Sequence, residues 1–100
     1  MIFEGNGQQY KVGMSGNTRS ELDKLLFKAV LADKGEQFVN AYQQIIRRLH
    51  QDPTVFGEPL YMLAKLELQM RHGAILPLLV DYGVHATKPL VFVRGFKSFE

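Results

Sequence analysis

Two long stretches of the chain repeat hydrophobic residues at the spacing of an α-helix. Within residues 15–31, and again between residues 33 and 52, apolar positions recur every three or four residues. Such spacing places them along one side of a helix. Because only a few residues separate the two stretches, we expect an antiparallel helical hairpin whose apolar sides cover a sheet. The apolar side chains are Leu22, Leu25, Leu26, Ala29 and Val30 in the first helix, and Phe38, Tyr42, Ile45 and Leu49 in the second.

Short polar motifs predict where these helices begin and end. Residues 18–21 and residues 20–23 both match a capping box, which leaves two starts open for the first helix. Residues 33–36 repeat the pattern and mark the start of the second helix. Pro53 disfavours the helical conformation of Asp52, so we expect the second helix to end there.

Other segments alternate apolar and polar residues with the period of a β-strand, or are apolar throughout. Residues 10–14 alternate and indicate a leading, half-buried strand. Three more strands are expected in residues 66–72, 75–84 and 89–96, of which the last two are apolar on both faces, as in central strands. In the first of the three, Leu66, Leu68 and Met70 are expected to be buried, and Glu67, Gln69 and Arg71 to be exposed.

The connections between these elements carry turn residues. Gly73 and residues 86–89 predict the turns between the three late strands, which favours an antiparallel meander. Residues 52–60 contain two prolines and must carry the chain from the helices to the sheet. In that crossing segment, Phe56 and Leu60 are expected to fill the space between the two layers.

Together these elements predict an α+β fold in a single domain that spans residues 1–100. An N-terminal strand leads the chain, and turn chemistry at Gly5-Asn6-Gly7 indicates a hairpin with Ile2 and Phe3 in its other arm. A two-helix antiparallel hairpin follows, and then a three-stranded antiparallel meander. Both helices are expected on one face of the sheet.

Composition narrows the chemistry that this domain can carry. The chain is 46% hydrophobic and has a net charge of only +2, a weaker basic excess than most nucleic-acid-binding domains show. It has no cysteine, which excludes disulfides, thiolate catalysis and cysteine zinc sites. No secretory signal and no membrane-spanning run is visible, so we expect a cytoplasmic protein without a membrane partner.

The order of these elements and one passage of sequence resemble the RelE/ParE toxin superfamily. The passage "IIRRLHQDPTVFGEPLYML" is similar to the family's helix end and crossing, and "LELQMRHG" to its next strand with an Arg. The likeness covers about residues 8–99. It implies a toxin of a toxin–antitoxin pair, as in plasmid stabilization. RelE-like members cut messenger RNA on the ribosome, ParE-like members poison DNA gyrase, and a small antitoxin protein wraps the toxin.

The resemblance also implies a ribonuclease site that needs no metal and no cofactor. Cations on the sheet would stabilise the phosphate, and a base would take the proton of the ribose 2′-OH. By position, Arg71 matches the family's recurrent Arg, and Arg94 and Lys97 fall where its basic residues lie. His72 is the best available base, because imidazole exchanges protons near neutral pH. The predicted catalytic residues are therefore Arg71, His72, Arg94 and Lys97.

Alternative explanations stay open for these residues. Arg71 is also explained as a solvated strand-end cation or as the partner of Glu67 or Asp81 in a salt bridge, and exposed pairs of this kind contribute little. Arg94 either caps the sheet edge or faces a partner. Lys97 is also explained as a solvated charge near the end of the chain.

A second function is a non-catalytic protein-interaction module on the same scaffold. The family's Gly-Asp-Tyr-Arg-like start to the middle strand is absent, and Phe96 and Phe99 stand where a terminal Tyr or His would complete the site. Gyrase binding would need a longer or more basic end than "RGFKSFE". The partners expected for an active toxin are an antitoxin and RNA or the ribosome. A homodimer is compatible with the sequence.

Overall fold

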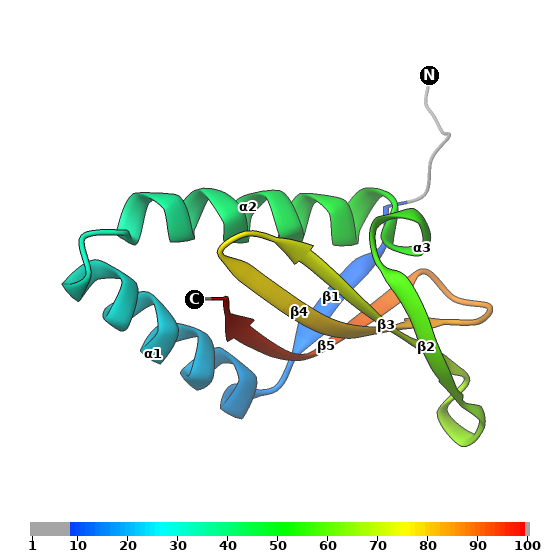
Figure 1. Cartoon of the computed structure of the whole chain (residues 1–100). Coiled ribbons are helices and arrows are strands. Elements are labelled where there is room, and N and C mark those ends of the chain that lie inside the picture. Colours follow the sequence, from blue (N-terminus) through cyan, green and yellow to red (C-terminus); the bar gives the residue numbers. More distant parts are fainter. Residues whose placement is uncertain (1–8, 100) are drawn as a thin grey trace.

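The computed structural model describes residues 9–99, which form helices packed on one twisted sheet (Figure 1). The α+β class predicted from the sequence is confirmed. The predicted N-terminal hairpin with Ile2 and Phe3 lies outside the described residues. The elements in chain order are β1 Lys11–Met14, α1 Gly16–Leu31, α2 Gly35–Gln51, α3 Pro53–Phe56, β2 Glu58–Leu63, a 3₁₀ turn η1 Ala64–Leu66, β3 Leu68–Ile75, β4 Leu78–His85 and β5 Leu90–Ser98.

The strands form one five-stranded sheet in the order β1-β5-β4-β3-β2. β3, β4 and β5 make an antiparallel meander, but β1 and β2 extend it on either side. β1 is parallel to β5, with Lys11 beside Leu90 and Met14 beside Val93. The predicted antiparallel meander is confirmed, but the whole sheet differs from the prediction, because β2 adds an antiparallel strand and β1 a parallel one, which makes the sheet five-stranded and mixed.

β2 begins within the predicted crossing, residues 52–60, and continues to Leu63, where no strand was predicted. Its pairing with β3 is interrupted by a bulge between Pro59 and Tyr61, where Leu60 is the extra residue. A bulge bends a strand and tolerates a proline, which has no N–H to donate to the ladder. Leu60 is exposed instead of filling the space between the layers, so that part of the prediction is wrong. Leu66 is also exposed, because β3 begins only at Leu68.

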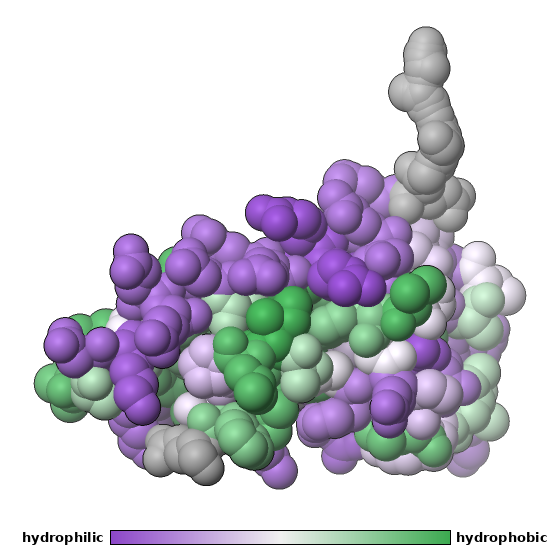
Figure 2. Space-filling view, turned by 45° about the horizontal axis from the view of Figure 1, so that its top comes forward, coloured by the Kyte–Doolittle hydropathy of each residue, from purple (hydrophilic) through white to green (hydrophobic). Residues whose placement is uncertain are grey.

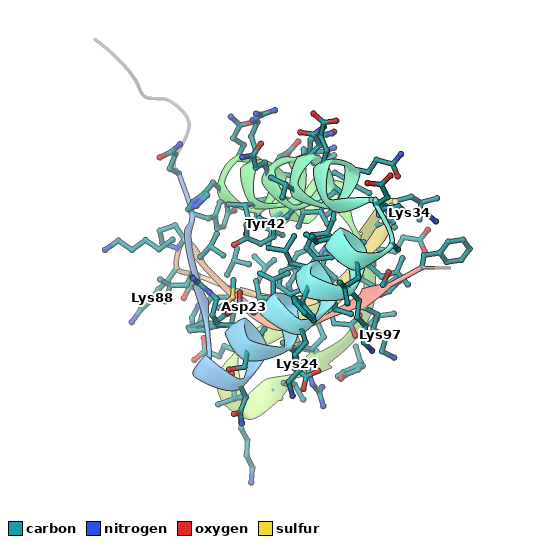
Figure 3. All side chains as sticks on the ribbon, turned by 90° about the vertical axis from the view of Figure 1, so that its left-hand side faces the viewer. Asp23, Lys24, Lys34, Tyr42, Lys88 and Lys97 are labelled. Atoms are coloured by element: carbon teal, nitrogen blue, oxygen red, sulfur yellow. The ribbon has the colours of Figure 1, made fainter. Side chains whose placement is uncertain are left out.

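The helices α1 and α2 pack over one face of the sheet and enclose the main hydrophobic core. Figure 3 shows side chains filling the space between helices and strands, with Tyr42 of α2 directed into it. Figure 2 shows hydrophilic residues over the outer face of α2, as its predicted stripe requires. Val30 of α1 is exposed, in contrast to its predicted burial. The buried core consists of Leu22, Phe38, Ala41, Ile45, Leu49, Leu78, Val80, Tyr82, Val84, Val91, Val93 and Phe96.

Both predicted helix starts are wrong. The N-cap of α1 is Ser15, whose hydroxyl accepts a hydrogen bond from the Thr18 N–H. The Thr18 hydroxyl donates to the Arg94 carbonyl of β5, so this side chain anchors the helix to the sheet instead of capping it. The N-cap of α2 is Lys34, without a side-chain cap, because Asp33 adopts a left-handed turn conformation with φ 64°.

The crossing segment packs closely on the sheet. α2 ends before Asp52, as Pro53 predicts, and one turn of helix, α3, leads to Gly57. A Cβ at Gly57 would lie 2.5 Å from Tyr82 Oη and 2.7 Å from the His72 carbonyl oxygen, so the approach requires glycine. Phe56 packs against the core and stacks on Tyr82 with ring centroids 6.1 Å apart, which agrees with its predicted place between the layers.

One of the two predicted turns is wrong. Gly73 lies inside β3, where its missing side chain makes room for the Phe56 ring, 2.6 Å from the place of a Cβ. The chain turns instead at Leu76-Pro77, between β3 and β4. The other predicted turn, at residues 86–89, is confirmed.

Candidate functional site

The two faces of the sheet differ in what covers them. Cross-strand partners share a face, and successive residues of a strand point to opposite faces. Arg71 pairs with Tyr82 on the face that α1 and α2 cover, whereas His72 pairs with Asp81 on the opposite face. We call the latter the helix-free face, because the long helices of the described chain lie on the other side (Figure 1). By register it carries Tyr61, Met70, His72, Asp81, Gly83, Phe92 and Gly95.

Arg71 lies on the helix-covered face and is only 9% exposed, so its predicted place on the exposed side is wrong. Its Nη2 donates to the carbonyl oxygens of Thr54, at 2.7 Å, and Gly57, at 2.6 Å. Carbonyls at a helix end have no partner within the helix, and Arg71 supplies one here. Within residues 9–99, it forms a salt bridge with neither Glu67 nor Asp81. Arg71 therefore fastens the crossing segment to the sheet.

Tyr82 assists Arg71 from the neighbouring strand. Its hydroxyl donates to the Pro53 carbonyl at 2.7 Å. Burial raises the pKa of Tyr82, and the adjacent Arg71 guanidinium offsets part of that increase. We call Arg71 and Tyr82 the crossing clamp, because together they bind carbonyls of residues 53, 54 and 57. Arg71, which the sequence predicts as a phosphate-binding cation, is therefore engaged in the crossing clamp.

His72 and Asp81 form a partly exposed pair on the helix-free face. His72 Nδ1 lies 2.6 Å from Asp81 Oδ1, and the two side chains are 43% and 40% exposed. An ionised carboxylate only accepts hydrogen bonds, so the proton of a neutral His72 belongs on Nδ1. Nε2 then carries the free lone pair. A base held in orientation by a carboxylate is a recurrent arrangement in enzymes that activate a hydroxyl.

Arg94 lies over the helix-free face. It is the extra residue of a bulge in the pairing of β4 with β5, and bulges re-aim side chains. Its Nη1 donates to the Tyr61 hydroxyl at 2.8 Å, although β4 and β3 separate the two strands. Arg94 thus reaches across the face. β1 pairs with β5 only as far as Val93, so the alternative of a sheet-edge cap stays a prediction.

A row of residues connects these groups. His72, Asp81 and Gly95 are successive cross-strand partners on β3, β4 and β5. Apart from its chain neighbours Arg94 and Phe96, no residue comes within 4 Å of the place where a Cβ of Gly95 would stand, so the surface there is open toward the other strands. At a strand spacing of about 4.8 Å, this opening is about 10 Å from the His72 backbone. Lys97 follows on the same side of β5 and is exposed near its outer end (Figure 3).

The structure therefore brings three of the four predicted site residues to one face and separates Arg71 from them. Sequence reasoning missed the place of Tyr61, because it predicted no strand in residues 58–63. It also missed that Asp81 pairs with His72. Both residues are equally far from the Leu76-Pro77 turn, so placing the turn there would have predicted the pair. Pro77 was the signal for this turn, but the turn was predicted at Gly73 instead.

Other polar groups of the described chain serve the fold. His50 Nδ1 lies 2.7 Å from the Tyr10 carbonyl oxygen, and His85 Nδ1 accepts backbone N–H groups of the turn that follows β4. At the end of α2, Arg48 pairs with Asp52 at 2.7 Å, which raises the pKa of Arg48. Within residues 9–99, there is no group of three His, Cys, Asp or Glu side chains that could hold a metal ion.

A second surface feature lies between the helices and the end of β5. It is a groove of about 670 Å³, and it is lined by apolar residues and lysines. The helix α1 also exposes apolar residues on its outer side, so it is apolar on two sides. The lining includes Leu25, Ala29, Phe38, Phe96 and Phe99 with Lys28, Lys34 and Lys97, and the outer apolar residues of α1 are Phe27, Val30 and Leu31.

Comparisons with protein-family models, with curated proteins and with solved structures find no match to this chain. In residues 9–99, neither α1 nor α2 has the length and apolar character that crossing a bilayer requires.

Proposed function

We propose that this chain is a RelE/ParE-like toxin-type domain that cleaves messenger RNA on the ribosome without a metal ion. One observation carries the proposal: the His72–Asp81 pair lies in one row with the open surface over Gly95. Arg94 and Lys97 flank that opening along β5. A base and two cations therefore surround a space that a phosphodiester could enter.

The chemistry follows from the position of each group. His72 Nε2 accepts the proton of a ribose 2′-OH, and the 2′-oxygen forms a bond to the adjacent phosphorus. The bond from phosphorus to the 5′-oxygen breaks, and that oxygen takes a proton from water. The products are a 2′,3′-cyclic phosphate and a 5′-hydroxyl end. Arg94 and Lys97 stabilise the added negative charge, and Asp81 stabilises the imidazolium that forms.

The fold is compatible with this proposal. Two antiparallel helices pack on a sheet whose central strands form a meander, and the Asp52-Pro53 passage ends the second helix. The helix-covered face is filled by the core and the crossing clamp. The helix-free face is thus where the sheet can present charged side chains to RNA.

The direct test uses purified protein and translating ribosomes. We expect cleaved messenger RNA with cyclic phosphate ends, and a loss of about 100-fold in cleavage rate for His72→Ala, the size typical of a lost general base. His85→Gln is the matched control, because this histidine bonds the turn after β4 and lies outside the row. Intact messenger RNA with the unmodified protein would refute the proposal.

A second candidate function is a non-catalytic protein-interaction module. The two-sided apolar character of α1 and the adjacent groove favour it, because a helix that is apolar on two sides normally buries both. Under the first proposal, the same groove would take a small antitoxin, and its lysines would attract acidic residues of that partner. Protein that binds such a partner but never cleaves RNA would favour the second candidate.

A further inference from the structure

The helix-free face carries a second cross-strand row, next to the row of His72. It runs from Gly13 of β1 through Phe92, Gly83 and Met70 to Tyr61 of β2. Phe92 and Tyr61 are each 46% exposed, although both lie inside strands. We infer that this aromatic row binds single-stranded RNA by stacking bases on Phe92 and Tyr61. The inference rests on the proposed function and specifies the form of RNA that it takes.

The surroundings of Phe92 leave one side of its ring open. Its partners on both neighbouring strands are glycines, Gly13 on β1 and Gly83 on β4. Over Gly83 the space is filled, because Met70 Sδ would lie 2.8 Å from a Cβ there. A Cβ at Gly13 would meet only the Phe92 ring, at 4.0 Å. A glycine inside a strand often marks a place where a ligand comes close, and here it exposes an aromatic ring.

Tyr61 stands at the other end of the row. Three strand spacings, about 14 Å, separate its backbone from that of Phe92, so each ring would take a separate base. The Arg94 guanidinium contacts the Tyr61 hydroxyl and lies on the same face. A planar guanidinium binds phosphate and also stacks, so it suits the nucleotide next to Tyr61.

The aromatic row also lies at a suitable distance from the proposed base. His72 follows Met70 by two residues on β3, which is about 7 Å along the strand. An RNA strand whose bases stack on the aromatic row would therefore pass its sugar–phosphate backbone near His72 Nε2. The row thus positions the substrate for the chemistry of the neighbouring row.

Charge and chemistry favour nucleic acid over an apolar peptide as the occupant. Lys11, Arg94 and Lys97 lie on the same face by register or contact and can bind phosphates, and they outnumber the carboxylates of Glu58 and Asp81 on that face. Every base has a π face, so stacking on aromatic side chains tolerates many sequences. Bases inside a duplex are not accessible to such stacking. We therefore expect a preference for single strands with little sequence selectivity.

The test measures binding without cleavage. Fluorescence anisotropy would compare a labelled hexamer of 2′-O-methyl RNA with its blunt duplex and with an abasic strand of equal charge. The methyl group removes the nucleophile, so the strand stays intact. We expect the single strand to bind about tenfold more tightly than either, and Phe92→Leu to lose about tenfold, while Phe92→Tyr keeps the affinity.

A second variant separates stacking from loss of the ring. Gly13→Val keeps Phe92 but places a β-branched side chain beside it, in a strand where valine is well tolerated. We expect binding to fall about as far as in Phe92→Leu. The inference is wrong if the abasic strand binds equally well, if both variants bind like the parent, or if no strand binds. Binding that depends on Phe92, together with intact messenger RNA, would support the inference and refute only the proposed catalysis.

Discussion

The two faces of the sheet use neighbouring residues of β3 in opposite ways. Arg71 points to the helix-covered face, where its guanidinium is buried against carbonyls of the crossing segment. His72, the next residue, points to the helix-free face, where it is partly exposed beside Asp81. The sequence alone makes both residues candidates for the same site. Strand parity and the cover over each face therefore decide which polar residue is available for function.

The largest expected effect comes from removing the cation on the helix-covered face. Arg71→Ala leaves two carbonyl oxygens, of Thr54 and Gly57, without their donor and opens a cavity beside them. We expect the free energy of unfolding to fall by about 3 kcal/mol, measured by urea denaturation. Arg94→Ala is the matched control and should change it by less than about 0.5 kcal/mol, because the residue is exposed. Equal stability of both variants would contradict the clamp.

On the helix-free face, the expected effect falls on activity instead of stability. Asp81→Ala removes the carboxylate that orients His72, and we expect RNA cleavage to slow by about 10- to 100-fold. Asp81→Asn should recover part of the rate, because its amide oxygen can still accept from Nδ1. The free energy of unfolding should stay within about 0.5 kcal/mol, as for an exposed pair. A pure loss of stability, with the rate per folded molecule unchanged, would rule out an orienting role.

The crossing clamp should also give the protein a distinct response to alkaline pH. Because burial raises the pKa of Tyr82, the folded state keeps its proton where the unfolded chain releases it. Its contribution to stability is complete below the ordinary tyrosine value of about 10 and is lost as the pH rises above it. Tyr82→Phe should reduce the slope of this loss and cost about 1 kcal/mol at pH 7 through the missing hydrogen bond to Pro53. The measurement is urea denaturation between pH 7 and about 11. An unchanged slope in the variant would contradict this assignment.

The smallest expected effect belongs to an ion pair outside both faces. Arg48 and Asp52 are about as exposed as His72 and Asp81, and the Arg48 guanidinium lies 5.1 Å from the centre of the Phe56 ring. We expect Arg48→Ala to lower the free energy of unfolding by less than about 1 kcal/mol, and by less at high salt. A loss as large as that of Arg71→Ala would mean that this pair, and not the clamp, holds the crossing segment.

Periodicity predicted the parts of the fold that depend on one buried side. The stripe of α2 and the central strands follow from the spacing of apolar residues, because a single core imposes that spacing. The end of α2 follows from Pro53. β2 was not predicted, because its residues Leu60, Tyr61 and Met62 are exposed at a sheet edge and show no alternation of buried and exposed positions. The helix caps were not predicted correctly either, because the Thr18 hydroxyl bonds to the Arg94 carbonyl of β5 instead of capping α1.

The candidate site was predictable only as far as residue type. His72, Arg94 and Lys97 were chosen by chemistry and by position in a resembling family, and the register together with the Arg94–Tyr61 hydrogen bond places them on one face. The prediction for Arg71 was wrong because alternation was taken to point the apolar residues of β3 toward the helices, whereas Leu68 and Met70 are buried on the helix-free face and Arg71 points to the covered one. Its partners are backbone carbonyls, and no sequence pattern marks those.

The most direct test of the central claim, that RNA binds the helix-free face, is a map of contacts by NMR. Amide chemical shifts would be followed while a short, single-stranded 2′-O-methyl RNA is added to the protein. We predict that the changes concentrate at His72, Phe92, Arg94 and Gly95, and that the outer side of α2 stays unchanged. Changes confined to α1 and the groove beside β5, or no change at all, would contradict the claim.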